Sequence, residues 1–311
     1  DLNPSTNTAM KNLGDFEMPG SVPDVSQEQG LTGGDWNYAG RNIHFGIREH
    51  AMGSIANGIA AHGGAIPFTA TFLVFADYMR PPMRLAALSD LKVIFVFTHD
   101  SIAVGEDGPT HEPVEQLLSL RAIPDLVTIR PADANETAEA WQVAMEMNAP
   151  SVLVFSRQDL PILDRADASG SVADGAYILS GPADPDIVLI GTGSEVDVAV
   201  QAAALLGEKG ITARVVSMPS WELFGRKDAA YRESVLGPAG TARVAVEAGV
   251  TLGWDRWVGE RGAVVGIDGY GASGPGSAVL KHFGFTAAHV AATALRVLGK
   301  DAQANEIDDR S

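Results

Sequence analysis

The feature of this sequence that most restricts its fold is a series of continuous apolar runs, rich in valine and isoleucine, separated by stretches of helical periodicity. A strand buried on both faces gives a continuous run, whereas a strand with one solvated face alternates apolar and polar residues. We therefore expect buried, parallel strands at 92–98, 126–130, 151–156, 187–191, 213–218, 243–247 and 263–268. Helices are expected at 49–62, 83–88, 114–121, 134–147, 195–209 and 287–298.

Strands and helices that alternate in this way predict the α/β class, with two doubly wound, mostly parallel-sheet domains joined by a linker. The alternation stops where Pro, Gly, Ser and Asp replace the aliphatic runs. This break predicts a first domain at 1–160, a linker at 161–185 and a second domain at 186–311. The polar residues from Lys300 onward are expected to fray. Pro81-Pro82 is expected to precede a helix, because proline is tolerated in a first turn but not in a helix interior.

Composition and charge disfavour several classes of protein. A formal net charge of -17 argues against binding to nucleic acid or to an anionic membrane surface. No apolar run approaches the roughly 20 residues that a membrane span needs. The sequence contains no cysteine, which removes disulfides, thiolate nucleophiles and cysteine metal sites. No export signal is visible, so a cytoplasmic location is expected.

The segment THDSIAVGEDGPTHEP, residues 98–113, is the most polar interruption of the apolar pattern. It leaves a predicted strand at its carboxyl end, where ligands bind in open α/β sheets, and the next helix directs free N–H groups at the same crevice. His99, Asp107 and His111 are therefore candidates for chemistry. Two alternatives are a solvated loop and a metal site built from these three residues, although the chelating pairs usual on one helix face are missing.

The stretch HFGIREHAM, residues 44–52, places an acid at the start of a predicted helix. Glu49 falls among Ile47, Met52 and Ile55, which indicates a largely apolar setting. Burying an unpaired carboxylate is costly, so such a Glu is paired, protonated or functional. The alternative is a first-turn acid that complements the helix dipole.

Two further motifs favour structural interpretations when taken alone. In FTATFLVFADY, Phe72, Phe75 and Tyr78 recur at three-residue spacing, and such an aromatic stripe is more often core than cofactor pocket. In GTGSE, residues 191–195, a single Gly-x-Gly is weak evidence for a phosphate-binding nest. We interpret it as a tight turn in which Ser194 or Thr192 caps the next helix.

Taken together and in order, these stretches resemble the second half of a transketolase. The string THDSI-x-x-GEDGPTH carries most of the specificity of this resemblance. The other matching stretches are DLNPS, HFGIREHAMGSIANGIAAHGG, TATFLVFADYMRP, LSRQDLP (here FSRQDLP), GTGSEVDVAV, RVVSMPS and DAAYRESVL. The resemblance runs nearly from end to end of the chain.

The resemblance implies an activity and a set of cofactor-binding residues. Transketolases transfer a two-carbon ketol unit from a ketose phosphate to an aldose phosphate, with thiamine diphosphate and a divalent metal, Mg²⁺ or Ca²⁺. Glu49 matches the residue that hydrogen-bonds the aminopyrimidine ring and favours the tautomer that takes the proton from the thiazolium carbon. Phe72 matches the ring stacked on the pyrimidine, while Phe75 and Tyr78 match the walls of that pocket. Asp1 matches a residue near the thiazolium ring.

The same resemblance implies the residues that contact the sugar phosphate. His111 matches a histidine beside the reacting carbonyl, suited to proton transfer near neutral pH. Asp107 matches the carboxylate that reads the stereochemistry of a substrate hydroxyl. His99, Arg157 and Ser5 match residues that hold the sugar and its terminal phosphate, for which a guanidinium offers a planar fork. Glu49, His99 and His111 are thus the expected catalytic residues.

A complete transketolase is about twice this length, and its other half holds the diphosphate and the metal through a Gly-Asp-Gly segment. GIDGYG, residues 266–271, does not match that segment. We therefore expect the chain to lack the metal ligands and the first strand of its pyrimidine-binding domain. The expected partners are sugar phosphates, a diphosphate-binding half and a second subunit of a homodimer.

Three alternatives to such an enzyme component stay open. The first is an inactive assembly module that keeps the subunit interface without turnover. The second is a relative of the dihydroxyacetone synthase type, which uses formaldehyde as acceptor. The third is a metal hydrolase that uses His99, Asp107 and His111.

Overall fold

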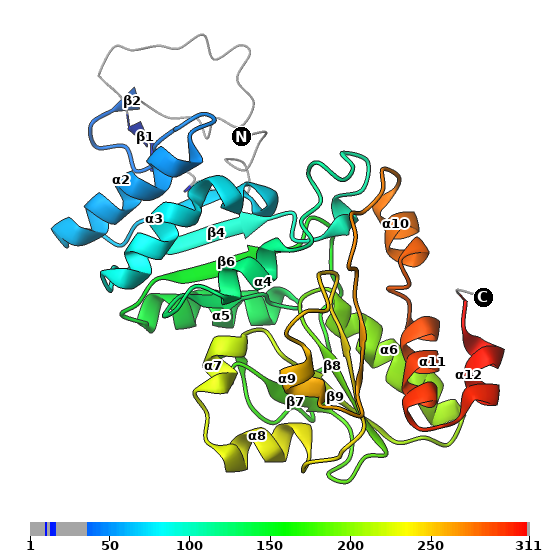
Figure 1. The fold of residues 1–311 in the computed structure, drawn as a ribbon. Helices are drawn as coiled ribbons and strands as arrows, with labels where there is room; N and C mark the ends of the chain where they lie inside the picture. The colour runs from blue at the N-terminus through cyan, green and yellow to red at the C-terminus, as the bar shows by residue number, and fades with distance from the viewer. Residues whose placement is uncertain (1–9, 11–12, 17–35, 310–311) are drawn as a thin grey trace.

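The computed structural model describes residues 10, 13–16 and 36–309 of the chain. Two α/β domains lie one above the other in the view of Figure 1, and each contains one central sheet between layers of helices. A short parallel pair, β1 (Asp15–Phe16) and β2 (Trp36–Asn37), lies beside the first domain. The expected α/β fold class with two mostly parallel sheets is confirmed.

The first sheet has the strand order β3-β4-β6-β5, and all of its pairings are parallel. Its strands are β3 (Phe68–Phe72), β4 (Ile94–Thr98), β5 (Val127–Ile129) and β6 (Ser151–Phe155). The helices of this domain are α2 (Glu49–His62), α3 (Ala76–Leu88), α4 (Gln116–Arg121) and α5 (Ala134–Glu146).

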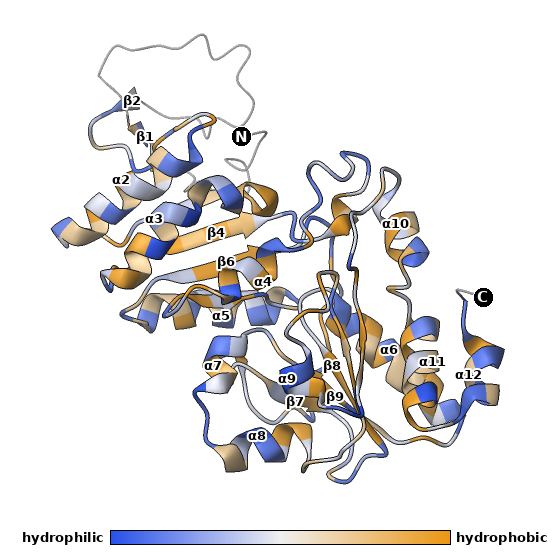
Figure 2. Cartoon of the chain, viewed as in Figure 1, coloured by the Kyte–Doolittle hydropathy of each residue, from blue (hydrophilic) through white to orange (hydrophobic). Residues whose placement is uncertain are grey.

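Strand β4 shows why the first sheet reads as a continuous apolar run. Phe95 and Phe97 pack in one cluster with α2, α3 and α4, whereas Ile94 and Val96 pack in another with α5. Successive side chains of a strand point to opposite faces, so a sheet covered on both faces needs apolar residues at every position. Figure 2 shows this as the orange strands β4 and β6 between helices of mixed polarity.

The second sheet has the order β11-β10-β8-β9-β7, in which only β7 is antiparallel to its neighbour. Its strands are β7 (Tyr177–Ser180), β8 (Ile187–Gly191), β9 (Ala213–Ser217), β10 (Arg243–Val246) and β11 (Ala263–Val265). One face packs on α6 (Glu195–Glu208), α11 (Ala287–Val297) and α12 (Asp301–Ile307). The other packs on α7 (Trp221–Gly225), α8 (Ala229–Leu236) and α9 (Asp255–Val258), while α10 (Gly276–His282) lies beside the first domain.

The expectation that Pro81 and Pro82 stand before a helix is wrong, because both lie inside α3. Each proline removes one backbone N–H from the helical ladder. Contacts with α2 compensate: the ring of Pro82 packs so closely on Gly53 that a Cβ added there would lie 2.8 Å from Pro82 Cγ. The side-chain amide of Asn57 also donates to the carbonyl of Pro82 at 2.8 Å.

The expectation of a fraying carboxyl terminus is wrong as well. Residues from 301 form α12, which packs on α11 through the fully buried Ala304. The segment 161–185, expected to join the domains, contributes β7, whose Tyr177 and Leu179 enter the second core. The sequence analysis missed this strand because it has only four residues and lies in a segment rich in Pro and Gly. None of the helices in the described part of the chain has the length and apolarity needed to cross a membrane.

Candidate active site

Three predicted site residues stand at adjacent strand ends of the first sheet. Phe72 closes β3 and pairs with Thr98, which closes β4, and Thr98 pairs in turn with Phe155 at the end of β6. His99 follows Thr98 directly, and Arg157 lies two residues beyond Phe155. The parallel register therefore places these side chains at the carboxyl edge of the sheet, where doubly wound domains bind ligands.

The aromatic side chains and both histidines form one cluster. The Phe72 ring stacks on the His99 ring with centroids 3.9 Å apart, and it lies parallel to the Phe75 ring at 6.2 Å. Phe75 also stacks with Tyr78 at 6.0 Å and meets His111 edge-on at 5.7 Å. Phe72 is 8% exposed and Tyr78 62% exposed, so the cluster runs from the core to the surface.

The three-residue spacing of the aromatic stripe spans a change of secondary structure. Phe72 ends β3, Phe75 ends the short 3₁₀ helix at Leu73–Phe75, and Tyr78 lies in the first turn of α3. The stripe therefore lies along a strand-to-helix junction. Its exposure rises along the junction, from the buried Phe72 to the exposed Tyr78.

His99 has a left-handed backbone, with φ of 64°. This conformation costs an L-residue other than glycine roughly 1–2 kcal/mol. Its Nδ1 makes a hydrogen bond of 2.9 Å with Thr98 Oγ1. Burial, followed by the charge of Arg157, lowers the pKa of His99, although Asp100 and Asp107 act in the opposite direction. A lowered pKa favours the neutral ring at neutral pH, and a neutral imidazole can both donate and accept a hydrogen bond.

The loop between η2 (Ile102–Val104) and α4 carries Asp107 and His111 and rests on the second domain. A Cβ added to Gly105, whose φ is 78°, would lie 2.7 Å from the carbonyl oxygen of Gly274. Ser273 Oγ donates to the carbonyl of Glu106 at 2.8 Å. The side chains of Asp107 and Arg157 are exposed.

Glu112, directly after His111, lies under the same loop. Its side chain is 3% exposed, and a Cβ added to Gly271 would lie 1.8 Å from Glu112 Oε2. Neither carboxylate oxygen has a hydrogen bond of good geometry to the described residues. Burial raises the pKa of Glu112 to about 7, and the nearby N–H groups of Gly105 and Ala272 offset only part of that effect.

Glu49 is the first residue of α2 and is 7% exposed, as its apolar surroundings in the sequence predicted. Within the part of the chain that the structure describes, its carboxylate has no hydrogen-bond or ion-pair partner. The structure does not join Glu49 to the aromatic cluster by any such contact. Asp1 and Ser5 lie outside the described residues.

No three His, Asp or Glu side chains among the described residues are arranged so that they could hold a metal ion. His99, Asp107 and His111 therefore do not form the metal site considered as an alternative. His99 stacks on Phe72 and His111 meets Phe75, so the two imidazoles face aromatic rings.

Comparison with known families assigns both domains. The transketolase pyrimidine-binding domain matches residues 1–162, which is more than half of the chain. The chain belongs to the transketolase family. The transketolase-like C-terminal domain matches residues 175–286.

Curated transketolases are similar to the chain over nearly all of its length. The transketolase of Sinorhizobium medicae is 53% identical over 296 residues, which cover 94% of this chain and 42% of that protein. The crystal structure of Leishmania mexicana transketolase superposes with a TM-score of 0.81 at 42% identity, covering 96% of this chain and 43% of that one. The chain thus spans less than half the length of these relatives.

A third match has a chain of comparable length. A structure described as a split gene transketolase, an inactive β4 tetramer, superposes with a TM-score of 0.70 and covers 92% of both chains. At 23% identity, that likeness shows the fold alone.

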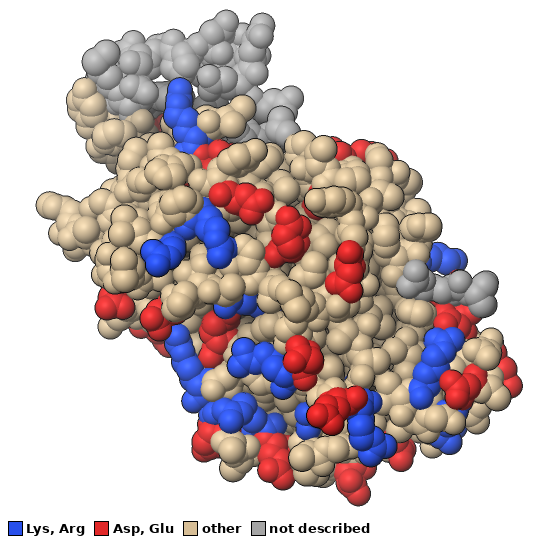
Figure 3. All heavy atoms as spheres, viewed as in Figure 1, with Lys and Arg blue, Asp and Glu red and all other residues tan. Residues whose placement is uncertain are grey.

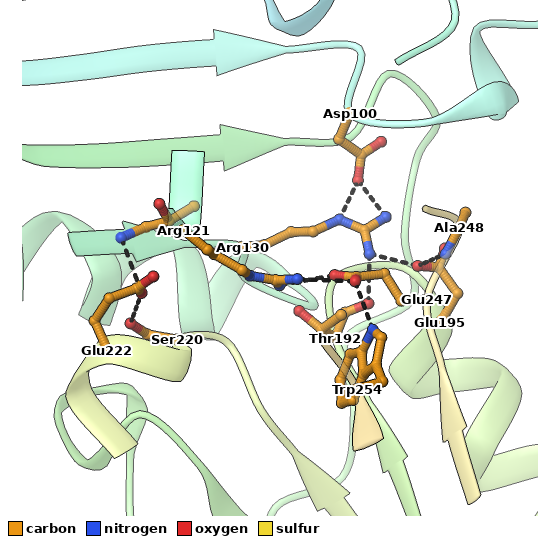
Figure 4. A network of polar contacts seen from close by, with 11 residues as sticks. Asp100, Arg121, Arg130, Thr192, Glu195, Ser220, Glu222, Glu247, Ala248 and Trp254 are labelled. Atoms are coloured by element: carbon orange, nitrogen blue, oxygen red, sulfur yellow. Dashed lines mark hydrogen bonds and ion pairs between the residues drawn. The ribbon is translucent and has the colours of Figure 1, made fainter. Parts of the chain in front are cut away.

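Sequence reasoning missed a set of buried charges next to the site of this transketolase-family chain. Asp100, Arg130 and Glu195 are each at most 2% exposed and form a continuous ion-pair network between the domains (Figure 4). The available signal was a charged residue at the carboxyl end of an apolar run, as in LVTIR and FVFTHD. Such a residue closes a buried strand and must find a partner outside it.

The GTGSE motif forms the predicted tight turn, with Gly193 at φ 57°, but the predicted capping is wrong. Ser194 stands at the N-cap of α6 without a side-chain cap, and its hydroxyl donates to Glu195 Oε1 at 2.6 Å. The carbonyl of Thr192 accepts from Arg130 at 2.9 Å. Arg130 of the first domain thus binds a carbonyl of this turn and does not replace the cap, which would have to accept from N–H groups of α6.

Proposed function

We propose that this chain supplies the pyrimidine-side and sugar-side half of a transketolase active site. The reaction is the thiamine diphosphate-dependent transfer of a two-carbon ketol unit from a ketose phosphate to an aldose phosphate. The observation that carries the proposal is the convergence of Phe72, Phe75, Tyr78, His99 and His111 at one carboxyl edge of a parallel sheet.

The side chains fit a flat heteroaromatic ring with a polar edge. Phe72 and Phe75 offer parallel rings, inclined by 3°, and aromatic faces favour stacking with another ring. Glu49 offers a buried carboxyl group with no partner among the described residues, which suits a ring nitrogen that must hold a proton. The chemistry that bound thiamine diphosphate supplies is carbanion stabilisation.

The remaining site residues act on the sugar phosphate. His99 is held neutral and hydrogen-bonds a hydroxyl of the sugar, and His111 moves a proton at the reacting carbonyl oxygen. Arg157 binds the terminal phosphate through its planar guanidinium group, while Asp107 accepts from a hydroxyl and so selects its configuration. Asp1 and Ser5, outside the described residues, would extend the cofactor and sugar contacts.

The diphosphate and its Mg²⁺ or Ca²⁺ belong to a separate half of the enzyme in this proposal, and a second subunit completes a homodimer. Support comes from exposed apolar side chains on and beside α2 and α3: Ile47 is 85% exposed, Leu88 71% and Leu85 52%. A protein contact would cover such large exposed apolar side chains. The domains of this half would be 1–160 and 186–311, joined by 161–185.

The charge distribution agrees with a small anionic substrate. Acidic and basic side chains are interspersed over the second domain on the face shown in Figure 3, where no continuous basic stripe is visible. The proposed location is the cytoplasm, where a chain without cysteine needs no oxidising environment.

Complementation tests the proposal. The chain would be mixed with the diphosphate-binding half of the Sinorhizobium medicae relative, thiamine diphosphate and Mg²⁺, and ketol transfer between sugar phosphates would be followed by product analysis. Turnover is expected from the mixture and from neither half alone. A stable complex without turnover would support the inactive assembly module, and transfer to formaldehyde in preference to an aldose phosphate would support the dihydroxyacetone synthase alternative.

A further inference from the structure

The second sheet has the strand order at which doubly wound domains bind ligands. Strand β8 continues to β9 on one side, and the chain then returns to β10 on the other side of β8. Outside the carboxyl ends of two strands that part in this way is the usual ligand position. Here the side chain of Arg130, from the first domain, binds at that position (Figure 4).

Arg130 is held at this position by both its backbone and its guanidinium group. Its N–H donates to the carbonyl of Pro219 at 2.9 Å, and its carbonyl accepts from the N–H of Gly193 at 3.2 Å. Nη1 donates to the carbonyl of Thr192 at 2.9 Å and pairs with Glu195 Oε2. A Cβ at residue 193 would lie 2.5 Å from Arg130 Nε, so glycine is required for this approach.

The opposite edge of the same guanidinium binds the residue that follows His99. Arg130 Nε and Nη2 lie 2.9 and 2.8 Å from Asp100 Oδ2. Arg130 has no exposed side-chain surface and Asp100 has 1%, so water does not screen this pair. One arginine therefore connects the turn after β8 with the backbone beside His99.

That connection adjoins an unfavourable backbone conformation. His99 has φ of 64°, and in this conformation its ring stacks on the Phe72 ring with centroids 3.9 Å apart. A left-handed residue other than glycine persists only when its surroundings hold it. On its amino side His99 continues β4, and on its carboxyl side Asp100 is held by Arg130.

We propose that Asp100 and Arg130 are positioning residues, through which the second domain holds His99 in the conformation that presents its ring to the substrate crevice. This inference rests on the proposed function only for the statement that His99 meets the sugar phosphate. The positioning itself is a property of this chain. It gives the second domain, which has none of the proposed substrate contacts, a direct effect on the site.

A second buried pair offers a matched control. Arg121 Nη1 and Nη2 lie 2.8 and 2.7 Å from the two carboxylate oxygens of Glu247, and these side chains are 4% and 2% exposed. The pair also joins the two domains, and Arg121 closes α4. The charge of Glu247 also acts on Arg130, but the hydrogen bonds of Arg130 go to Asp100, Thr192 and Glu195. Loss of the Arg121–Glu247 pair would weaken the domain contact and leave those hydrogen bonds in place.

The test compares Asp100→Asn with Glu247→Gln in the 311-residue chain by proton NMR of the histidine rings. The chain has seven histidines, and the signal lost in His99→Gln identifies the one of interest. Stacking on Phe72 gives that signal a ring-current shift. We expect Asp100→Asn to abolish the shift and Glu247→Gln to preserve it. A preserved shift in Asp100→Asn, or an equal loss in both variants, would overturn the proposal.

Two further measurements keep the test decisive. If Asp100→Asn does not fold, Glu195→Gln takes its place. Glu195→Gln keeps the pair of Arg130 with Asp100 but weakens the contact of Arg130 with the second domain, so we expect a reduced ring-current shift.

In the complemented enzyme, Asp100→Asn is expected to lower kcat/KM about a hundredfold, the scale of a displacement near 1 Å. Should complementation give no turnover even for the unaltered chain, the proposed function fails, while the NMR result still decides the positioning.

Discussion

The carboxyl edges of the two sheets both belong to doubly wound α/β domains, but they are used in opposite ways. At the first, Phe72, His99 and Arg157 lie at the ends of neighbouring strands, with His99 half-buried and Arg157 exposed. At the second, Thr192 and Glu247 follow β8 and β10, and arginines of the first domain bind there. Position at a sheet edge therefore predicts binding but does not predict whether the ligand is a small molecule or another domain.

The difference lies in where the charges find partners. Arg130 is fully buried, and its guanidinium group binds Asp100, Glu195 and the Thr192 carbonyl, all within the chain. Arg157 is exposed and its charge acts on the half-buried His99. An arginine that is satisfied internally stabilises the fold, whereas one without such a partner is available to a phosphate. The following predictions test this contrast, from the largest expected effect to the smallest.

The largest expected effect is a loss of kcat on substitution of Glu49 in the first domain. Glu49→Gln in the complemented enzyme is expected to lower kcat about a thousandfold, the scale of a lost proton-transfer group, because the amide cannot hold a proton at a ring nitrogen. Steady-state kinetics would measure this loss, and circular dichroism would check that the fold is kept. Glu208→Gln, an exposed acid at the end of α6, is the control and should keep full activity. Normal turnover in Glu49→Gln would contradict the assigned role.

Substitutions at the carboxyl edge of the second sheet should lower the free energy of unfolding. Arg121→Met leaves Glu247 buried without its cation and should lower the free energy of unfolding by about 3 kcal/mol. Urea denaturation measures this change. Arg165→Met, which breaks a partly exposed pair with Glu139, should cost about 1 kcal/mol or less. Equal losses of stability in the two variants would show that burial does not make the Arg121–Glu247 pair more important than the partly exposed pair.

Glu112 lies between the two edges and should make stability depend on pH. Its pKa is about 7 in the fold and 4.5 in the unfolded chain, so the folded state keeps the proton longer. The stability that the protonated form confers is complete below pH 4.5 and is lost as the pH rises through 7. Glu112→Gln stays neutral and should therefore be more stable than the wild type by about 2 kcal/mol at pH 8, with no difference at pH 4.

Thermal unfolding across this pH range would check the Glu112 prediction. Glu106→Gln changes an exposed acid in the same loop and should match the wild type at both pH values. A pH-independent gain in Glu112→Gln would attribute its effect to packing alone.

The smallest effect is expected for a substrate contact at the first edge. Arg157→Ala should raise KM for phosphorylated sugars about tenfold and leave kcat nearly unchanged, because a phosphate remote from the reacting bond contributes uniform binding. Kinetics with a non-phosphorylated ketose donor provide the control, since that substrate should not distinguish the variant from the wild type. An equal rise for both donors would argue against a phosphate contact.

Local patterns in the sequence predicted the elements well where they were long and apolar. Helix Glu49–His62 and strand Ile187–Gly191 begin and end at the predicted residues. Strand Phe68–Phe72 was missed because its aromatic spacing continues into the next helix and imitates a helical stripe. The start of helix α3 was predicted wrongly at Pro81 and Pro82. The contacts of Pro82 come from Gly53 and Asn57 of α2, which no pattern near the prolines indicates.

The position of the loop after β4 predicted His99, Asp107 and His111 as candidates, whereas Phe72, Phe75 and Tyr78 were assigned to the site only through the resemblance. The structure adds the geometry of the cluster. The stacking of His99 on Phe72 joins residues named separately in the sequence. The pairing of Arg130 with Glu195 spans 65 positions, and no local pattern specifies such a contact. The roles assigned to Glu49, Asp107 and Arg157 stay predictions.

Strand β7 determines how this molecule can be divided. It reaches the second sheet before β8 does and covers the outer edge of β9 in antiparallel pairing. A fragment cut at residue 186 would leave the backbone of β9 unpaired beside apolar side chains such as Val215, which is a template for aggregation. A fragment that starts before Ser169 would keep β7 as its edge strand and would not aggregate through β9. The N–H of Ser169 donates to the carbonyl of Ile178, within β7, at 2.8 Å.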